Sequence, residues 1–191
     1  MRQLPLPEDF GVLYACPAGE TEREQHAVAY AMLQEVLLRH AGLPELPEIV
    51  RTEMGKPFFP AHPELRFSIS HAKGLAVCLL SDKECGVDTE RRRPLREKVA
   101  ARVFSPEEQA ALAASDDPDM LFTRLWTLKE AYVKAIGIGV SYPLREVTFA
   151  LDGDAVQSNR TDAVFFHTTA EDYAVSVCCL TQRSEKGLEG S

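Results

Sequence analysis

Two long segments with helical periodicity restrict the fold of this 191-residue chain more than any other feature. Residues 21–41 contain neither Gly nor Pro, and their apolar side chains recur at the three- and four-residue spacing of an amphipathic helix. A second helical segment begins at Asp117-Pro118-Asp119 and continues to about Gly137. Each segment lies before short apolar runs separated by turn residues, a pattern typical of strands. The sequence therefore predicts an α+β fold.

Capping signals and alternation predict the remaining elements. Ser105 stands before Pro106, and Glu108 follows three residues after the serine, which is the pattern of a capping box at the start of a helix. Another helix is expected over 95–104, and the runs at 65–71 and 75–81 are expected to form a hairpin. The predicted strands occupy 49–53, 65–71, 75–81, 85–90, 145–151, 163–169 and 173–181.

The chain carries a faint internal repeat. The segment HAKGLAVCLL at 71–80 is similar to TAEDYAVSVC at 169–178. We expect two similar α/β halves in one chain, related by a pseudo-twofold, with a cleft between them; a repeated amphipathic strand would explain the same likeness without such symmetry. The expected division is an N-terminal half at 1–93, a C-terminal half at 94–181 and a disordered tail at 182–191.

Composition and charge narrow the functional classes. The chain is 45% hydrophobic, which is enough to bury a core, but no run approaches the roughly 18 consecutive apolar residues of a membrane span. The first thirty residues are acidic and lack the apolar stretch of a signal peptide, so a cytoplasmic location is expected. The net charge of −8 argues against general binding to nucleic acid, which needs a basic face.

The five cysteines show none of the C-x-x-C pairs that metal or redox sites use. Three of them lie in apolar runs. We therefore expect reduced, buried thiols that pack as small hydrophobic side chains.

The helix predicted to end near Gly137 carries charges beside its apolar face. Glu130 and Lys134 are one turn apart, next to Trp126, and the helical position of Lys129 falls inside the apolar arc. An ordinary surface pair of Glu130 with Lys134, with Lys129 extending to solvent along its methylene stem, explains these charges without any function.

The strand GVDTE presents two carboxylates on one face. Asp88 and Glu90 are two residues apart, so the period of a strand puts them side by side, with Thr89 on the opposite face. Adjacent carboxylates repel unless a cation lies between them, and Mg²⁺ prefers such oxygen ligands. The alternative is a strand that ends in solvent, with its charge balanced by the following arginines at 91–93.

Two further segments have the residue types of a phosphate site. FSISH places Ser70 and His71 at the end of a predicted strand, where a hydroxyl and an imidazole can meet a phosphate, although a structural histidine is equally consistent with the pattern. The segment GKP at 55–57 combines a glycine with Lys56. It is not a Walker loop, and alone it reads as an ordinary turn.

Taken in order, GKP, FSISH, GVDTE, FSPEE and WTLKEAYVK resemble the 4′-phosphopantetheinyl transferases, specifically the monomeric Sfp-like type. The resemblance implies two similar halves that bind coenzyme A and Mg²⁺ in the cleft between them. It implies transfer of the 4′-phosphopantetheine arm of coenzyme A to a serine hydroxyl of an acyl or peptidyl carrier protein, with release of adenosine 3′,5′-bisphosphate. A monomer is expected because both halves are present in one chain, and the charge and the short apolar runs predict neither a nucleic-acid nor a membrane partner.

The resemblance assigns roles to residues of this chain. The implied Mg²⁺ ligands are Asp88, Glu90 and Glu130. Glu130 is also expected to accept the serine proton, directly or through a metal-held water, and Lys134 to stabilise the departing phosphate. Lys129 and Lys134 are expected to face the coenzyme phosphates. The residues expected to hold the adenine and 3′-phosphate end are Lys56, Pro57, Ser70 and His71.

The chain departs from the family pattern at the start of its first long helix. Relatives carry there an Arg that meets the 3′-phosphate, whereas this chain has Gln25 or His26. The departure motivates an alternative, a non-catalytic module that binds coenzyme A or a carrier protein; a metal-dependent phosphohydrolase is a third hypothesis. The basic run at 91–102 is a candidate docking surface for an acidic carrier protein, or a solvated helix start.

Overall fold

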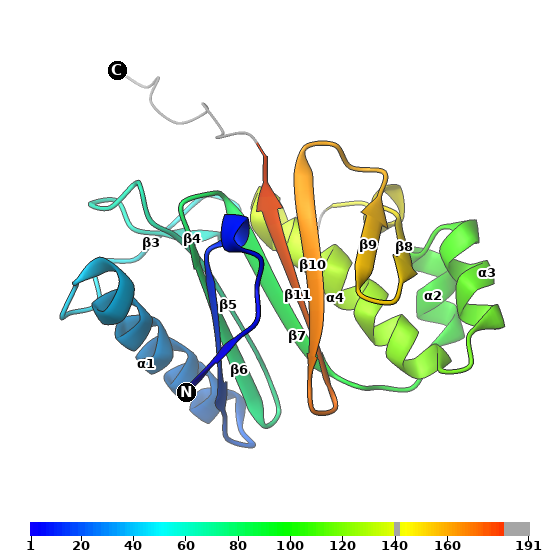
Figure 1. Cartoon of the computed structure of the whole chain (residues 1–191), viewed down its shortest axis with the longest axis horizontal. Helices are drawn as coiled ribbons and strands as arrows, with labels where there is room; N and C mark the ends of the chain where they lie inside the picture. Colours follow the sequence, from blue (N-terminus) through cyan, green and yellow to red (C-terminus); the bar gives the residue numbers. More distant parts are fainter. Residues whose placement is uncertain (140–141, 182–191) are drawn as a thin grey trace.

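The computed structural model describes residues 1–139 and 142–181, and the tail expected at 182–191 lies outside the described residues. The fold is mixed α/β, as the sequence predicts. Two antiparallel sheets face each other in the middle of the molecule, with helix α1 (Glu22–Ala41) outside one sheet and helix α4 (Pro118–Ile136) outside the other (Figure 1). No helix among the described residues is long and apolar enough to cross a membrane.

Helix α1 packs against the outer face of the first sheet. Its strand order is β1-β2-β6-β5, and its hairpin β5–β6 is the one predicted from the sequence. Strand β6 is buried along its whole length because both of its faces are covered. Ala76, Cys78 and Leu80 pack toward helix α1, whereas Val77 and Leu79 pack toward the second sheet. The bounds are β1 Arg2–Leu4, β2 Val12–Pro17, β5 Arg66–Ala72 and β6 Leu75–Ser81.

The second sheet has the order β10-β11-β7 and packs against helix α4. Its inner face meets the first sheet through one hydrophobic cluster that includes Val87, Val175 and Val177. Its strands are β7 Cys85–Arg91, β10 Ala163–Ala170 and β11 Tyr173–Leu180. The other elements are η1 Glu8–Phe10, β3 Val50–Arg51, β4 Pro57–Phe58, α2 Glu97–Val103, α3 Pro106–Ala114, η3 Leu144–Glu146, β8 Phe149–Asp152 and β9 Ala155–Ser158.

Local signals in the sequence locate the helices well. Thr21 and Ser105 each form a capping box with the Glu three residues later, and Gly42 and Gly137 end α1 and α4 in the left-handed conformation. Strands β1, β2, β4 and β9 were not predicted. Strand β2 is fixed by pairing with β6, far away in the sequence, which no local pattern reveals.

Strand β7 is placed differently from the expected division of the chain. A division after residue 93 puts β7 with the first half, but β7 forms its hydrogen-bonded ladder with β11, pairing Asp88 with Ser176. By strand pairing, β7 therefore belongs to the second sheet. The cysteines agree with the expectation of free thiols: all five are unpaired, and four of them are buried.

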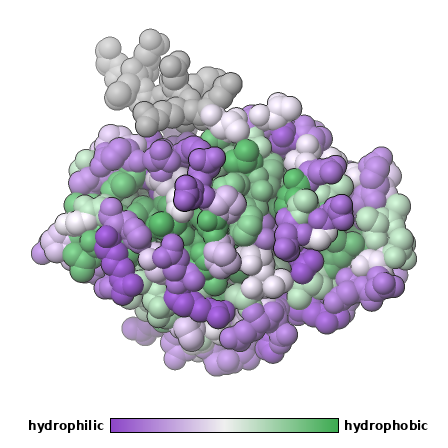
Figure 2. Space-filling view, in the orientation of Figure 1, coloured by the Kyte–Doolittle hydropathy of each residue, from purple (hydrophilic) through white to green (hydrophobic). Residues whose placement is uncertain are grey.

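The face drawn in Figure 2 is mostly hydrophilic, with hydrophobic residues gathered toward the middle, over the strands. Among residues 1–139 and 142–181, Met54 is the most exposed large hydrophobic side chain, at 54%. It lies in the loop between β3 and β4.

Lys129 is buried in the core around helix α4, and neither expectation for it holds. Its side chain is 0% exposed, and its ammonium lies 2.9 Å from Glu108, which is also buried. The ammonium also donates hydrogen bonds to the carbonyls of Leu144 and Val147. Lys129 therefore neither extends to solvent nor faces a pocket. Its helical position inside the apolar arc was correctly predicted, but the buried partner comes from helix α3.

Glu108 satisfies several groups at once. Its carboxylate accepts hydrogen bonds from the backbone N–H of Ser105 at 2.8 Å and of Phe149 at 2.9 Å, in addition to the ion pair with Lys129. One carboxylate thus joins the start of α3, the middle of α4 and strand β8. Burial lowers the pKa of Lys129, and the hydrogen bond to Glu108 opposes this shift.

Replacing Glu108 with Ala should destabilise the protein by about 3–5 kcal/mol, because it leaves the buried ammonium of Lys129 without its counter-charge. Chemical denaturation of the variant measures this loss. Glu107→Ala is the matched control, since Glu107 is the exposed neighbour on the same helix turn. A loss below about 1 kcal/mol for Glu108→Ala would mean that the pair is not a structural element of the core.

His167 on β10 should make the stability depend on pH. It is 2% exposed, and neither ring nitrogen has a hydrogen-bond partner among the described residues. Burial, followed by the charge of Arg124, lowers the pKa of His167 from its ordinary value of 6.5. As the pH falls below that value, the unfolded chain takes up a proton that the folded chain resists. The contribution of His167 to the free energy of unfolding should therefore decrease from pH 7 to pH 5.

His167→Leu should flatten this part of the stability profile, as measured by urea denaturation at a series of pH values. Thr169→Val, at an exposed position of the same strand, removes no titratable group and is the control that should keep the wild-type slope. An unaltered slope in His167→Leu would assign the pH dependence to other groups.

Candidate active site

One pocket of about 600 Å³ gathers most of the predicted site residues. Strands β5 and β7, helices α1 and α4 and the loop between β3 and β4 all contribute to its wall. Three carboxylates line it: Asp88, Glu90 and Glu130. The predicted residues Lys56, Pro57, Ser70, His71 and Lys134 also line it, whereas Lys129 does not.

Serine hydroxyls join the two sheets at the pocket. The backbone N–H of Val87 donates to Ser68 Oγ at 3.0 Å, and that of Thr89 donates to Ser70 Oγ at 3.3 Å. Strands β5 and β7 are edge strands of different sheets. The serine side chains of β5 therefore accept hydrogen bonds from backbone N–H groups on the edge of β7. The alternating serines of FSISH thereby set the position of GVDTE. Ser68 was not among the predicted site residues.

Asp88 is the most buried carboxylate of the pocket, at 6% exposed. Its Oδ1 accepts hydrogen bonds from Ser70 Oγ at 2.9 Å and from the Lys134 ammonium at 2.7 Å. Its Oδ2 is buried and has no hydrogen-bond partner among the described residues. A buried carboxylate oxygen without a donor is costly, so this atom is suited to a ligand that the protein alone does not supply.

Helix α4 approaches β7 closely enough to bring its charges to Asp88. Gly86 makes this approach feasible: a Cβ at this position would lie 2.0 Å from the carbonyl oxygen of Ala131. Lys134 consequently reaches across to β7 and donates also to Ser70 Oγ at 3.0 Å and to the Val87 carbonyl at 3.1 Å. Glu130, one turn earlier on the helix, lines the same pocket.

The three carboxylates influence one another electrostatically. Burial raises the pKa of Glu130, and the charges of Asp88 and Glu90 raise it further, whereas Lys134 opposes the shift. Burial also raises the pKa of Glu90, with Arg93 opposing and Asp88 adding to the shift. Crowded carboxylates of this kind favour a cation among them.

The residues present fit a hard divalent cation such as Mg²⁺. All three carboxylates offer oxygen ligands, and the unpartnered Oδ2 of Asp88 is available. Among residues 1–139 and 142–181, however, no three metal-binding side chains are gathered tightly enough to form a finished site. Lys134 instead supplies the positive charge next to Asp88.

His71 and Gln25 lie at the end of the pocket formed by helix α1. His71 Nδ1 donates to Gln25 Oε1 at 3.2 Å. Burial lowers the pKa of His71, and the charges of His26 and Lys134 lower it further. Gln25 is buried and its amide donates to the carbonyls of Gly19 and Glu20, so it ties down the start of the helix. His26, rather than Gln25, lines the pocket.

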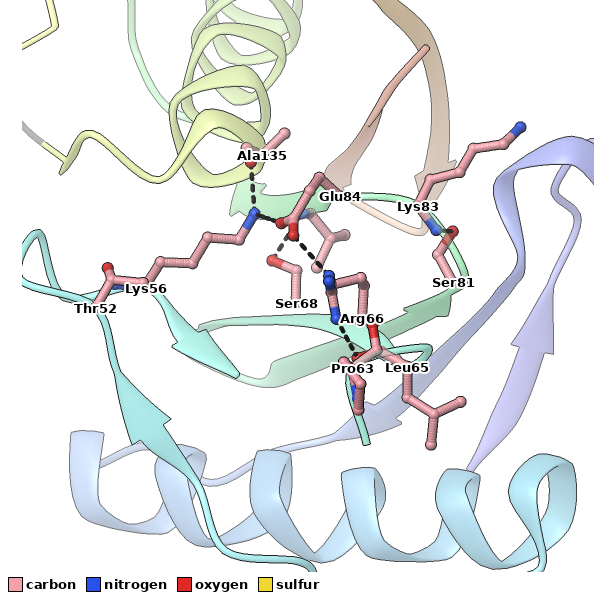
Figure 3. A network of polar contacts seen from close by, with 11 residues as sticks. Thr52, Lys56, Pro63, Leu65, Arg66, Ser68, Ser81, Lys83, Glu84 and Ala135 are labelled. Carbon is pink, nitrogen blue, oxygen red and sulfur yellow. Dashed lines mark hydrogen bonds and ion pairs between the residues drawn. The ribbon is translucent and has the colours of Figure 1, made fainter. Parts of the chain in front are cut away.

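Lys56 lines the pocket with its stem but directs its charge elsewhere. Its ammonium bonds to Glu84 and to the carbonyl of Ala135 at the end of α4, and Glu84 also binds Arg66 (Figure 3). Contact of Lys56 with a coenzyme stays a prediction.

Several pocket residues were missed in the sequence. The ring of Tyr30 lies 4.5 Å from that of His26, and the Arg51 guanidinium donates to Tyr30 Oη at 3.5 Å and to the Gly55 carbonyl at 2.9 Å. Trp126, noted only as a neighbour of Glu130, also lines the pocket and lies under the guanidinium of Arg93 at 4.8 Å. Tyr30 and Arg51 come from a helix and a short hairpin that carry no motif; only their convergence on one pocket identifies them.

Comparison with known proteins places the chain in a family. The model of the 4′-phosphopantetheinyl transferase superfamily matches residues 84–178. A 4′-phosphopantetheinyl transferase of Bacillus subtilis is 35% identical over 145 residues, covering 72% of this chain and 65% of the relative. The 4′-phosphopantetheinyl transferase AcpT of Salmonella typhimurium is 44% identical over 107 residues, covering 53% of this chain and 55% of the relative.

Each of these alignments spans less than two thirds of the relative's own length. Among solved structures, the holo-[acyl-carrier-protein] synthase of Thermotoga maritima is similar with a TM-score of 0.46 and 21% identity, covering 52% of this chain and 64% of that chain.

The matched stretch runs from just before β7 into β11 and therefore includes all three pocket carboxylates and Lys134. The chain belongs to the 4′-phosphopantetheinyl transferase superfamily.

Proposed function

We propose that this protein transfers the 4′-phosphopantetheine group of coenzyme A to a serine hydroxyl of an acyl or peptidyl carrier protein, in a reaction that depends on a divalent cation and releases adenosine 3′,5′-bisphosphate. The observation that carries the proposal is the pairing of Asp88 with Lys134, in a pocket that also holds Glu90 and Glu130. The names of the relatives agree with it.

In this proposal, Asp88, Glu90 and Glu130 hold Mg²⁺. The ion, when bound, neutralises the charge of the coenzyme pyrophosphate. The Lys134 ammonium is on the same wall and would stabilise the charge of the departing phosphate. Glu130 faces the pocket and would accept the proton of the attacking serine, directly or through a water.

The other end of the pocket suits the adenosine part of the coenzyme. The rings of His26 and Tyr30, 4.5 Å apart and tilted by 35°, would offer aromatic contact to a base, and Arg51 would offer a guanidinium to a phosphate. Arg51 would take the place of the helix-start Arg that relatives carry. The absence of that Arg was the reason to consider a non-catalytic binding module, and Arg51 weakens this alternative.

We further propose that the chain consists of two related halves. The order β2–α1–β5–β6 is repeated as β7–α4–β10–β11, and in both sheets the last strand lies between the other two. The similar segments 71–80 and 169–178 fall on β6 and β11, in support of the repeat. The halves would then divide between β6 and β7. Monomeric state and cytoplasmic location stay predictions.

Asp88→Asn should abolish carrier labelling, with a rate at least about 100-fold lower. The substitution removes one negative charge from the proposed cation site, and it also removes the ion-pair partner of Lys134. The measurement is intact mass spectrometry of an apo carrier protein after incubation with coenzyme A and Mg²⁺. Chelation with EDTA should also abolish labelling, and excess Mg²⁺ should restore it.

Asp116→Asn, at an exposed position between α3 and α4, is the matched control and should label normally. Circular dichroism shows whether Asp88→Asn stays folded. Binding of coenzyme A by the wild type without any mass shift would favour the binding module, and coenzyme hydrolysis without labelling would favour the phosphohydrolase.

The basic run at 91–102 leads to a second prediction, on carrier docking. Arg92 and Arg96 are exposed, and Arg92 also pairs with Asp117 at 2.9 Å, whereas Arg93 pairs with Glu90 at 3.3 Å. The double variant Arg92→Glu with Arg96→Glu should raise the KM for an acidic carrier about 3- to 10-fold at low salt, with a smaller effect at high salt.

Steady-state kinetics with a carrier titration measures this KM. Arg2→Glu on β1 makes the same kind of charge change at a distant exposed site and should have no effect. An unchanged KM in the double variant would place the docking surface elsewhere.

A further inference from the structure

The turn before β7 carries a charge network that the proposed chemistry does not use (Figure 3). Glu84 Oε2 accepts from the Lys56 ammonium at 2.5 Å, and Glu84 Oε1 accepts from Arg66 Nε at 2.6 Å. The side chains of Lys56 and Glu84 are only 14% and 18% exposed. Since the Lys56 ammonium also binds the carbonyl of Ala135, the network joins the β3–β4 loop, strand β5 and the end of α4.

The β3–β4 hairpin is a pocket wall with few attachments of its own. Each of its strands has two residues, and they pair with each other. Arg51, Met54, Gly55, Lys56 and Pro57 nevertheless line the pocket. Phe59, which follows β4, is fully buried and stacks on Phe67, so it holds this segment to the first sheet. Lys56 is the residue that extends from the hairpin to helix α4.

Gly137, at the end of α4, leaves room for the side chain of Lys56. Gly137 has a φ of +71°, and a Cβ there would lie 2.8 Å from Lys56 Cδ. The carbonyls of the last helical turn lack partners within the helix and form the negative end of its dipole, so a lysine ammonium is well placed there. The charge of Lys56 is therefore satisfied by Glu84 and Ala135 before any ligand arrives.

We propose that Glu84 is a positioning residue of the coenzyme site: it holds Lys56 against the end of α4, and so keeps the hairpin wall at a fixed spacing from Glu130 and Lys134. The inference rests on the proposed function. With Glu84 in place, coenzyme A meets a wall that is already ordered. Without it, part of the binding energy has to order the hairpin, which weakens affinity without touching the reacting groups.

Glu84→Gln keeps the shape of the side chain and removes its charge. We expect the KM and the calorimetric Kd for coenzyme A to rise about tenfold, with kcat within about twofold of the wild type. Lys56→Met should have the same effect, and the double variant should be no worse than either single one, because both changes break one connection. Hydrogen exchange of residues 50–58 should increase in all three.

Asp82→Asn is the matched control, since Asp82 is exposed in the same turn and its loss removes the same charge. It should leave the KM and the exchange unchanged. If Lys56 instead bound a coenzyme phosphate through its charge, Glu84→Gln would free the ammonium; a KM that stays equal or falls, while Lys56→Met raises it, would overturn the proposal.

The two hypotheses fail in different ways. Wild-type protein that binds coenzyme A but labels no carrier would refute the proposed function, while the calorimetric Kd and hydrogen exchange would still test Glu84. Normal labelling with the same Kd in every variant would refute the role of Glu84 alone. Thermal unfolding identifies any variant that has lost its fold, and Lys56→Met then tests the same connection without removing the carboxylate.

Discussion

The pocket depends on one constraint, the seam between the two sheets. The seam consists of the side-chain hydrogen bonds that join the edge strands β5 and β7. Two serine hydroxyls of β5 accept the backbone N–H groups of Val87 and Thr89, so the first sheet holds the edge of the second at one register. Ser70 also donates to Asp88, which makes the same hydroxyl part of the seam and part of the site. A one-residue slip of β7 would turn its carboxylates away from the pocket.

Helix α4 contributes the other wall, and the buried pair of Lys129 with Glu108 sets its rotation. Lys129 and Glu130 are neighbours in sequence, but a helix turns them about 100° apart. With the Lys129 ammonium held in the core, Glu130 is directed to the pocket, and Lys134 lies one turn further on the same side. A buried ion pair is weak evidence for a net gain in stability. It can still specify the orientation of a helix, because few other arrangements would keep the two buried charges paired.

Much of this arrangement follows from the sequence, because it depends on local rules. Capping boxes at Thr21 and Ser105 define the starts of two helices, and the strand period puts Asp88 and Glu90 on one face. The direction of Lys129 was not predictable, since its partner comes from another helix and its position alone fits several outcomes. The same holds for β7, whose pairing with β11 depends on residues far along the chain. Tyr30 and Arg51 carry no signal at all until the fold brings them to one pocket.

Charge compensation is the common feature of the pocket wall. Lys134 is paired with Asp88, Arg93 with Glu90, and Lys56 with Glu84. Carboxylates next to a bound pyrophosphate would repel it, so an anionic coenzyme that entered alone would lose affinity to Asp88, Glu90 and Glu130. In the proposed function, a divalent cation held by these carboxylates would remove this repulsion, and Lys134 could then turn from Asp88 toward phosphate. Coenzyme and cation would therefore strengthen each other's binding, and by linkage the effect would be equal in both directions.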